Sequence, residues 1–253
     1  MKFLIRLFYL PMFLIVGNGI AIYIVQSGLS KGWLFVLVSA FIALAFVLER
    51  AVPYAAAFNE SQGDRVRAFF HALVNETFNV LGVLSVPLVA SFISLPSIWP
   101  HTLPLWQQLL IAILIADVGI TLAHFASHRI HTLWRLHAVH HSVKRMYGFN
   151  GLMKHPLPVV AVVLQLLLQH SNVAYFTGPL KYLLAINVVH RFHHLKTAEE
   201  GDVNFGLFTN LTDFCLSTAY YDRRRIIRTD DLGIGDQPDY PSGYLSQLIQ
   251  PFR

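Results

Sequence analysis

Four apolar stretches with almost no charged side chains constrain the fold of this chain more than any other feature. They cover residues 7–25, 32–48, 68–95 and 105–123. A helix rises about 1.5 Å per residue, so about 20 apolar residues cross the roughly 30 Å hydrocarbon core of a bilayer. We therefore predict an all-α, multi-pass integral membrane protein with about four spans.

The composition agrees with a membrane protein. Only 13% of the 253 residues are charged and 55% are hydrophobic, whereas a soluble domain carries roughly 25% charged residues. The net charge of +5 also suits nucleic-acid binding, but the basic residues lie beside apolar segments, which favours an anionic lipid surface over nucleic acid. Cys215 is the only cysteine, which excludes internal disulfides, iron–sulfur clusters and zinc sites made of several thiolates.

The positions of Lys and Arg predict the orientation in the membrane. Lys2 and Arg6 precede the first stretch, three arginines lie between the second and third, and the chain after residue 124 is rich in both types. The opposite side has only Lys31. We expect both termini, and the chain after the fourth span, to be cytoplasmic.

Histidines are concentrated in that last region. Six of the chain's 13 histidines lie in the 18 residues HFASHRIHTLWRLHAVHH, and HRFHH follows about fifty residues later. One HxxxH and two HxxHH patterns place eight rings on helical faces, because residues three and four apart share a face. These eight are His124, His128, His137, His140, His141, His190, His193 and His194. They exceed the four ligands of one tetrahedral zinc and suit two metal ions that keep open positions.

Other histidines lack this spacing. His71 and His101 are isolated, and His131 does not share the helical face of His124 and His128. We predict that these three do not bind the metals.

The order of the motifs resembles the fatty acid hydroxylase superfamily, in particular its bacterial sterol desaturase-like members. The matching pieces are Asp117 seven residues before the HxxxH, LWRLHAVHHS at 133–142, HPL at His155, HSNV at His170, HRFHH at 190–194, DVNFG at 202–206 and the closing YPSGYLSQLIQPFR. Any one HxxxH alone would be a weak signal, whereas this ordered set is specific.

The resemblance implies a membrane-bound enzyme with a non-haem di-metal centre, normally two irons, that hydroxylates or desaturates a lipid from the bilayer with O2 and two electrons. It adds His170 to the eight ligands above, and it gives His155 no definite role. Zinc is able to occupy such a site in a purified sample. The bacterial members imply the inner membrane, with the active site on the cytoplasmic face.

Each ligand imidazole needs a partner for its second nitrogen. The predicted partners are Asp117, Asp202, Asn204 and Asp213. Asp117 lies about 10 Å from His124 along a helix axis, so we expect it to support a histidine of a neighbouring helix. For Asp202 and Asn204 a plain turn is an equally weighted alternative, and Glu76 is left without a role.

Three regions follow from these patterns. Residues 1–123 form the transmembrane region, 124–221 the histidine-cluster catalytic region and 222–253 a cytoplasmic C-terminal tail. The apolar segment 156–169 is short for a span and predicts a buried, re-entrant or interfacial helix, which leaves the substrate channel undefined. Residues 171–189 are predicted to form a half-buried helical segment.

The chain has no dinucleotide fingerprint and no haem-attachment motif. We therefore expect an external electron donor of the ferredoxin or cytochrome b5 type. Arg223, Arg224, Arg225 and Arg228 would dock it or, as an equal alternative, rest on anionic lipid.

Two other functions remain open from sequence: a metal-binding membrane protein or transporter, and a catalytically inactive relative. The identity of the lipid, the choice between hydroxylation and desaturation, and the oligomeric state also remain open.

Overall fold

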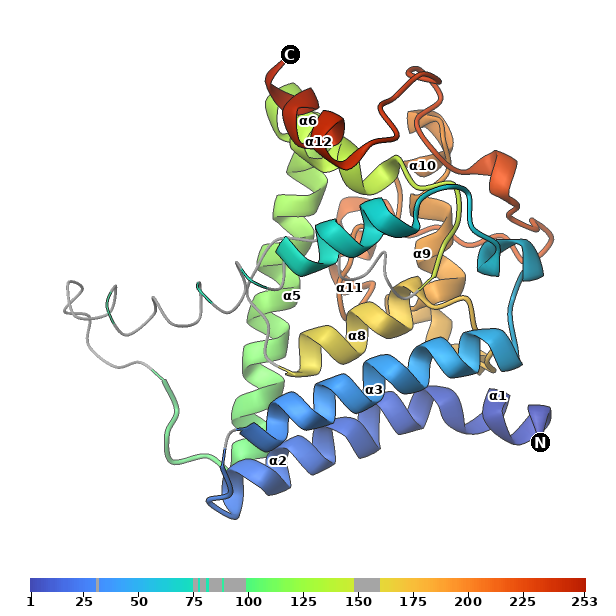
Figure 1. The fold of residues 1–253 in the computed structure, drawn as a ribbon. Helices are drawn as coiled ribbons and strands as arrows, with labels where there is room; N and C mark the ends of the chain where they lie inside the picture. The colour runs from blue at the N-terminus through green and yellow to red at the C-terminus, as the bar shows by residue number, and fades with distance from the viewer. Residues whose placement is uncertain (31, 75–76, 78–80, 82–87, 89–98, 148–159) are drawn as a thin grey trace.

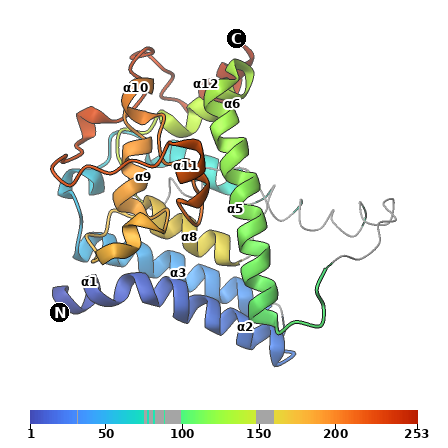
Figure 2. The ribbon, with the colours of Figure 1, turned by 180° about the vertical axis from the view of Figure 1, so that it is seen from behind.

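The computed structural model describes residues 1–30, 32–74, 77, 81, 88, 99–147 and 160–253. Within these residues every regular element is a helix, as Figures 1 and 2 show from opposite sides. Three of the helices are long and apolar enough to cross a membrane: the continuous helix Lys2–Gln26, α3 (Gly32–Ala51) and α5 (Leu105–Arg129). The all-α membrane class is therefore confirmed.

The predicted span at 68–95 lies mostly outside the described residues, as do Glu76 and His155. Its described start belongs to a helix over 65–74.

The remaining helices are short. They are η2 (Ala56–Asn59), α6 (His131–His141), α8 (Val160–His170), η3 (Gly178–Tyr182), α9 (Asn187–His193), α10 (Ala198–Gly201), α11 (Leu211–Leu216), η4 (Thr229–Asp231), α12 (Tyr244–Ile249) and η5 (Gln250–Phe252).

The first spanning helix is interrupted by one wider turn. It consists of α1 (Lys2–Pro11), the π-helical turn η1 (Met12–Gly17) and α2 (Asn18–Gln26). Pro11 has no N–H to donate inside the helix, and the Asn18 side-chain amide donates to the Leu14 carbonyl at 2.9 Å. A Cβ on Gly17 would lie 2.6 Å from Leu164, so this glycine allows the first span to approach α8 closely.

Helix α8 lies at the centre of the fold, between α3 and α9 (Figure 1). Leu164, Leu167 and Leu168 are fully buried in a core formed with α1, η1 and α3. Of the three environments predicted for this apolar segment, the described part adopts the buried one. Its last residue, His170, is therefore held inside the protein.

The segment after α8 differs from its prediction. Residues 171–189 contain only the short helix η3 and the start of α9, joined by irregular chain. Gly178 has a φ of +49° and Pro179 follows it, so a continuous helix is interrupted there. The predicted half-buried helical segment is therefore wrong for most of its length.

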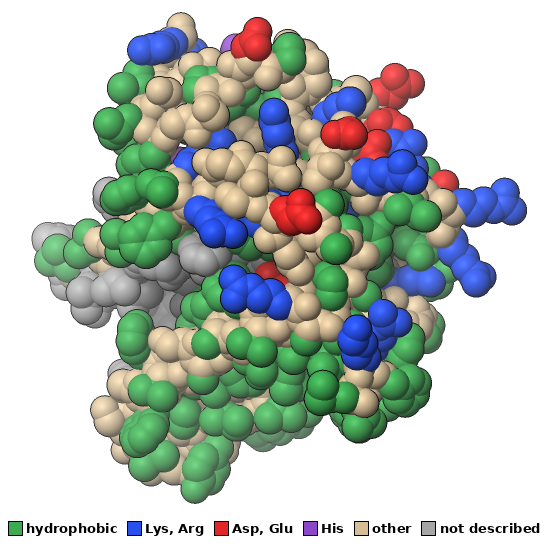
Figure 3. All heavy atoms as spheres, turned by 45° about the vertical axis from the view of Figure 1, so that its right-hand side comes forward, with side chains coloured by type: hydrophobic (Ala, Val, Ile, Leu, Met, Phe, Trp, Pro, Cys, Tyr) green, Lys and Arg blue, Asp and Glu red, His purple; other side chains and the backbone are tan. Residues whose placement is uncertain are grey.

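Charged and apolar surfaces are separated. Hydrophobic side chains dominate the lower part of Figure 3, over α1–α3, whereas most charged side chains lie above them. Helix α5 runs upward from α2 to α6, and the tail from 222 onward crosses the upper part of the molecule (Figure 1). The Lys196 N–H donates to the Asp231 carbonyl at 2.9 Å, which joins this tail to the chain after α9.

Candidate metal centre

The structure brings all nine histidines of the predicted ligand set together in two adjacent groups. The five-histidine group consists of His124, His128, His137, His141 and His193, and the four-histidine group consists of His140, His170, His190 and His194. Within each group the ring nitrogens that face one another lie within 4.8 Å. This geometry suits one metal ion per group.

Three helices form the five-histidine group. His124 and His128 lie in the last turns of α5, His137 and His141 lie one turn apart on α6, and His193 ends α9. The Nε2 atom of His137 is 3.0 Å from that of His124 and 3.1 Å from that of His141. The helical spacing read from the sequence therefore does bring these rings together.

The four-histidine group joins α6, α8 and α9. The Nε2 atom of His170 lies 3.3 Å from that of His140 and 3.2 Å from that of His190, which is 3.2 Å from that of His194. All four residues are buried. His194 stacks on His141 with ring centroids 4.8 Å apart, so the two groups are neighbours.

The protonation of His193 tests whether a metal fits. Its Nδ1 lies 2.9 Å from the Val203 carbonyl oxygen, which only accepts, so Nδ1 carries the proton. Its Nε2 is buried and has no hydrogen-bond partner among the described residues. Burial and then the neighbouring His124 lower the pKa of His193 well below its usual range, so the ring is neutral at pH 7. A neutral imidazole with a buried lone pair facing other histidines fits a cation.

Two other rings have the same orientation. The Nδ1 of His124 donates to the Phe205 carbonyl at 2.8 Å, and the Nδ1 of His170 donates to the Leu166 carbonyl at 3.1 Å. Each of these rings therefore turns its Nε2 lone pair toward its group. This arrangement of outward N–H and inward lone pair is typical of metal-binding histidines.

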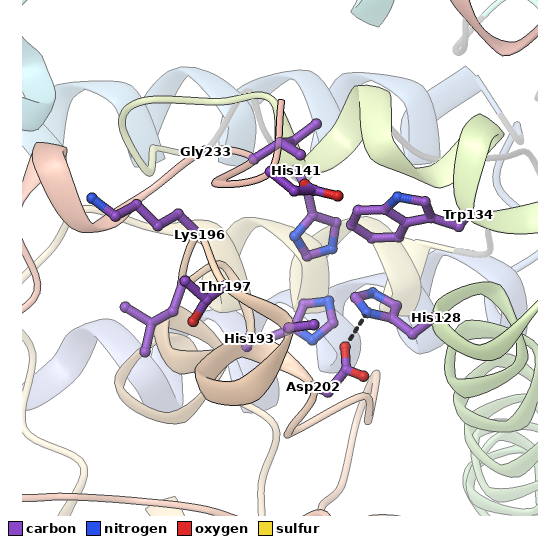
Figure 4. A pocket seen from close by; sticks show the side chains of 13 residues that line it. His128, Trp134, His141, His193, Lys196, Thr197, Asp202 and Gly233 are labelled. Carbon is purple, nitrogen blue, oxygen red and sulfur yellow. Dashed lines mark hydrogen bonds and ion pairs between the residues drawn. The ribbon is translucent and has the colours of Figure 1, made fainter. Parts of the chain in front are cut away.

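Asp202 is the one predicted carboxylate that contacts a histidine of the groups. The Nδ1 of His128 donates to its Oδ1 at 2.8 Å (Figure 4), and Arg129 lies 3.3 Å from its other oxygen. The prediction for Asp202 therefore agrees with the geometry, and the alternative of a plain turn does not describe it fully.

Asp117 does not contact a histidine, so that prediction is wrong. Its Oδ1 accepts the N–H of Phe208 at 2.7 Å and of Leu207 at 3.2 Å, and its other oxygen accepts from Thr209. The carboxylate is buried and the loop after residue 203 covers it, so the nearest donors are backbone N–H groups. Asp117 instead anchors this loop.

Asp213 binds the same loop, 203–209, and Asn204 belongs to that loop and ties it to α9; neither side chain bonds a histidine among the described residues. Asp213 accepts the N–H groups of Phe205 and Gly206, both at 2.8 Å. The Asn204 amide donates to the Val189 carbonyl at 2.9 Å, from a backbone with a φ of +55°. The three predicted residues therefore orient the ligands indirectly, through the Val203 and Phe205 carbonyls.

Arg191 was not predicted as a site residue, although it lies inside the HRFHH motif. It is buried, its guanidinium lies 3.7 Å from the centre of the Tyr54 ring, and it donates to the Ser171 carbonyl at 3.0 Å. Burial lowers its pKa to about 10, so it remains charged at pH 7. These contacts fix the rotation of α9, which carries His190 and His193 and is followed directly by His194.

A pocket of about 330 Å³ opens onto the five-histidine group (Figure 4). His128, His141 and His193 form its floor, and the Trp134 indole forms one side. Lys196, Thr197, Asp202 and Asp236 add polar groups to its walls. A small molecule or part of a larger one has access to this group from here. The motif LWRLHAVHHS contained Trp134 without assigning it a role, and Lys196 lay outside every motif.

The histidines predicted to be bystanders lie outside both groups. His101 and His131 are exposed, and the His71 Nε2 lies 3.0 Å from the Gln247 side-chain oxygen. His155 is outside the described residues.

Comparison with known proteins gives one informative relative. The ornithine lipid hydroxylase OlsE of Rhizobium tropici is 29% identical over an alignment 277 positions long, which covers 96% of this chain and 82% of that protein. No family model matches the chain, and no solved structure matches it significantly. The relative confirms the resemblance drawn from the histidine motifs.

Proposed function

This chain resembles the fatty acid hydroxylase superfamily in its motifs and in its relative, and we propose that it is a membrane-bound lipid hydroxylase with two metal ions. The observation that carries the proposal is the convergence of nine histidines in two groups, one fully and one mostly buried. The spanning helices next to these groups suit a substrate drawn from the bilayer.

Iron is the metal we propose for both groups. Two iron ions would supply the redox chemistry with O2 that an unactivated C–H bond requires and that no side chain provides. Zinc binds imidazole equally well but has no redox chemistry, so a zinc-loaded preparation would be inactive. The five-histidine group would hold one ion and the four-histidine group the other.

The protein's own part in this reaction is to hold the rings in a fixed orientation and tautomer. The Val203 and Phe205 carbonyls and the Asp202 carboxylate keep the protons of His193, His124 and His128 on their outward nitrogens. Burial of the four-histidine group excludes bulk water from its lone pairs. The ligand geometry is therefore formed before any metal binds, which lowers the cost of reorganisation.

An ornithine lipid is the first substrate to test, because the relative is an ornithine lipid hydroxylase. For the same reason hydroxylation is proposed over desaturation. The polar walls of the pocket beside His128 and His193 suit the approach of a polar lipid group.

An external donor would supply the two electrons. Arg223, Arg224 and Arg228 are exposed, whereas Arg225 lies 3.5 Å from Glu200 and 3.3 Å from Asp231. Exposed arginines suit an acidic ferredoxin or cytochrome b5 type protein on the cytoplasmic face of the inner membrane. Charge steering would raise the encounter rate at low salt.

The competing functions account less well for the ligand positions. A transporter would place its ligands near the middle of spanning helices, yet His124 and His128 lie in the last turns of α5 and the other seven lie on α6, α8 and α9. An inactive relative would be expected to lose ligands, and all nine are present.

Expression in cells that contain ornithine lipid tests the function. Mass spectrometry of lipid extracts should show a species heavier by one oxygen atom when the intact chain is expressed, and none when His193→Ala is expressed at an equal membrane level. His101→Ala, which changes an exposed histidine outside both groups, should retain the product. Failure of the intact iron-loaded chain to oxidise any lipid in the presence of a donor would refute the proposal.

A further inference from the structure

A second pocket, of about 290 Å³, lies between α6 and the C-terminal segment. Figures 1 and 2 show α6 and α12 side by side at the end of α5. The pocket is lined by His131, Trp134, Arg135, Ala138, Gln237, Tyr240, Gln250 and Arg253. It holds none of the nine histidines of the metal groups, and nothing in the proposed reaction uses it.

Seven of the eight side chains carry a hydrogen-bond donor, and none is an acidic side chain. Neither the Arg135 nor the Arg253 guanidinium forms an ion pair within the described part of the chain. The Tyr240 hydroxyl is buried without a hydrogen-bond partner among the described residues. Burial raises the pKa of Tyr240 to about 12, so the hydroxyl keeps its proton at pH 7.

The buried Tyr240 hydroxyl costs free energy unless a ligand or water satisfies it. Two guanidinium groups with a hydroxyl and two amides form a receptor for carboxylate or phosphate oxygens, which arginine binds through two parallel hydrogen bonds. The chemistry of the pocket therefore selects an anion.

The position of the pocket favours a lipid headgroup over a soluble anion. Helix α5 is 25 residues long, about 37 Å, so the end where α6 begins lies near one boundary of a bilayer that α5 crosses. The elements that form the pocket also expose apolar side chains, among them Leu136 at 54%, Leu248 at 50% and Phe252 at 80%. Arginine, tyrosine and tryptophan beside exposed apolar groups are typical of the headgroup region.

We propose that this pocket binds the phosphate or carboxylate group of an anionic membrane lipid. Trp134 separates it from the pocket above the five-histidine group, because the indole lines both. A lipid bound through its anionic group is therefore adjacent to the metal centre. That this lipid is the substrate rests on the function proposed above, whereas its binding does not.

Trp134 gives a direct readout of occupancy. The chain has four tryptophans, and replacing Trp33, Trp99 and Trp106 by phenylalanine leaves only the one in the pocket. The full chain in neutral detergent is titrated with phosphatidylglycerol carrying brominated acyl chains, which quench a nearby indole. Brominated phosphatidylcholine, unlabelled phosphatidylglycerol and inorganic phosphate serve as comparison and competitors.

We expect saturable quenching by phosphatidylglycerol, little by phosphatidylcholine, and weak competition by phosphate. Arg135→Gln with Arg253→Gln should weaken binding by at least about tenfold, because two charge-assisted contacts are lost. Arg50→Gln with Arg65→Gln removes the same charge from exposed arginines elsewhere and should leave binding unchanged. Bound-metal content and thermal unfolding, measured on each variant, show whether it is folded.

Three results would overturn the proposal: equal quenching by the two lipids, equal affinity of the two double variants when both are folded, or competition by phosphate as strong as by phosphatidylglycerol. The last result would mean a site for soluble anions. None of these measurements requires turnover. They therefore distinguish failure of the lipid site from failure of the proposed hydroxylase function.

Discussion

At the scale of single residues, the arrangement of the metal centre depends on which ring nitrogen of each histidine carries the proton and which acceptor it faces. His124, His170 and His193 donate outward to carbonyl oxygens, and His128 donates outward to Asp202. The sequence predicted these ligands from spacing, since i, i+3 and i, i+4 pairs share a helical face. It could not predict the carbonyl acceptors, because every residue has a carbonyl and only the path of the chain decides which one faces a ring.

Asp202 gives a prediction at this scale. Asp202→Ala removes the acceptor of the His128 Nδ1 proton, and loss of such a partner typically lowers metal affinity by about 10–100-fold. Competition with a chelator measures this change. Asp236→Ala is the matched control, because Asp236 lines the same pocket and bonds to no histidine in the part of the chain that the structure describes. Equal metal affinity in the two variants would contradict the role given to Asp202.

At the scale of elements, the loop 203–209 connects three polar side chains to two ligands. Asp117 and Asp213 hold its N–H groups, and its Val203 and Phe205 carbonyls accept from His193 and His124. The sequence identified the two aspartates by motif resemblance but assigned them the wrong partners. Helical spacing predicts contacts within one helix face, whereas this loop meets α5 and α9 from a distant part of the chain.

Gly206 tests the importance of this loop. A Cβ at this position would collide with the Thr209 carbonyl, so Gly206→Ala must displace the loop backbone. We expect a loss of stability of about 1–3 kcal/mol, as for overpacked cores, and a lower metal content. Gly119→Ala on α5 places its methyl group where nothing lies within 4 Å and should change neither. Thermal unfolding and metal analysis of both variants measure these effects. Normal metal binding by Gly206→Ala would show that the position of the loop is not required for metal binding.

Two other segments have structures that their local sequence patterns did not determine. The apolar run before His170 had the length of a buried, re-entrant or interfacial helix, and only its packing between α3 and α9 distinguishes these. The helical prediction for 171–189 gave too little weight to Gly178 and Pro179. Both cases depend on tertiary neighbours or turn chemistry, which local composition represents poorly.

At the scale of the whole molecule, apolar and charged surfaces are separated (Figure 3). The all-α membrane class followed from composition and length alone, because charged side chains are too costly for a lipid-facing surface. Three span-length helices agree with that prediction.

The exposed arginines of the tail give a prediction at this scale. Arg223→Glu should lower kcat/KM for a reduced acidic donor several-fold at low salt, with a smaller effect at high salt, because screening weakens steering. Arg65→Glu makes the same charge change at an exposed position on the helix over 65–74 and should have little effect. Turnover with titrated ferredoxin measures both. An equal loss for the two variants would favour a general effect of charge over a docking site.

The number of metal ions bound per chain tests the central claim most directly. Elemental analysis of the full chain, purified from iron-supplied cells without chelators, should give two ions per chain in total, whether iron or substituting zinc. His140→Ala should lose metal, whereas His101→Ala, at an exposed position outside both groups, should keep two ions at equal folded yield. One ion or none in the intact protein, or equal loss in the two variants, would contradict a di-metal centre formed by the two histidine groups.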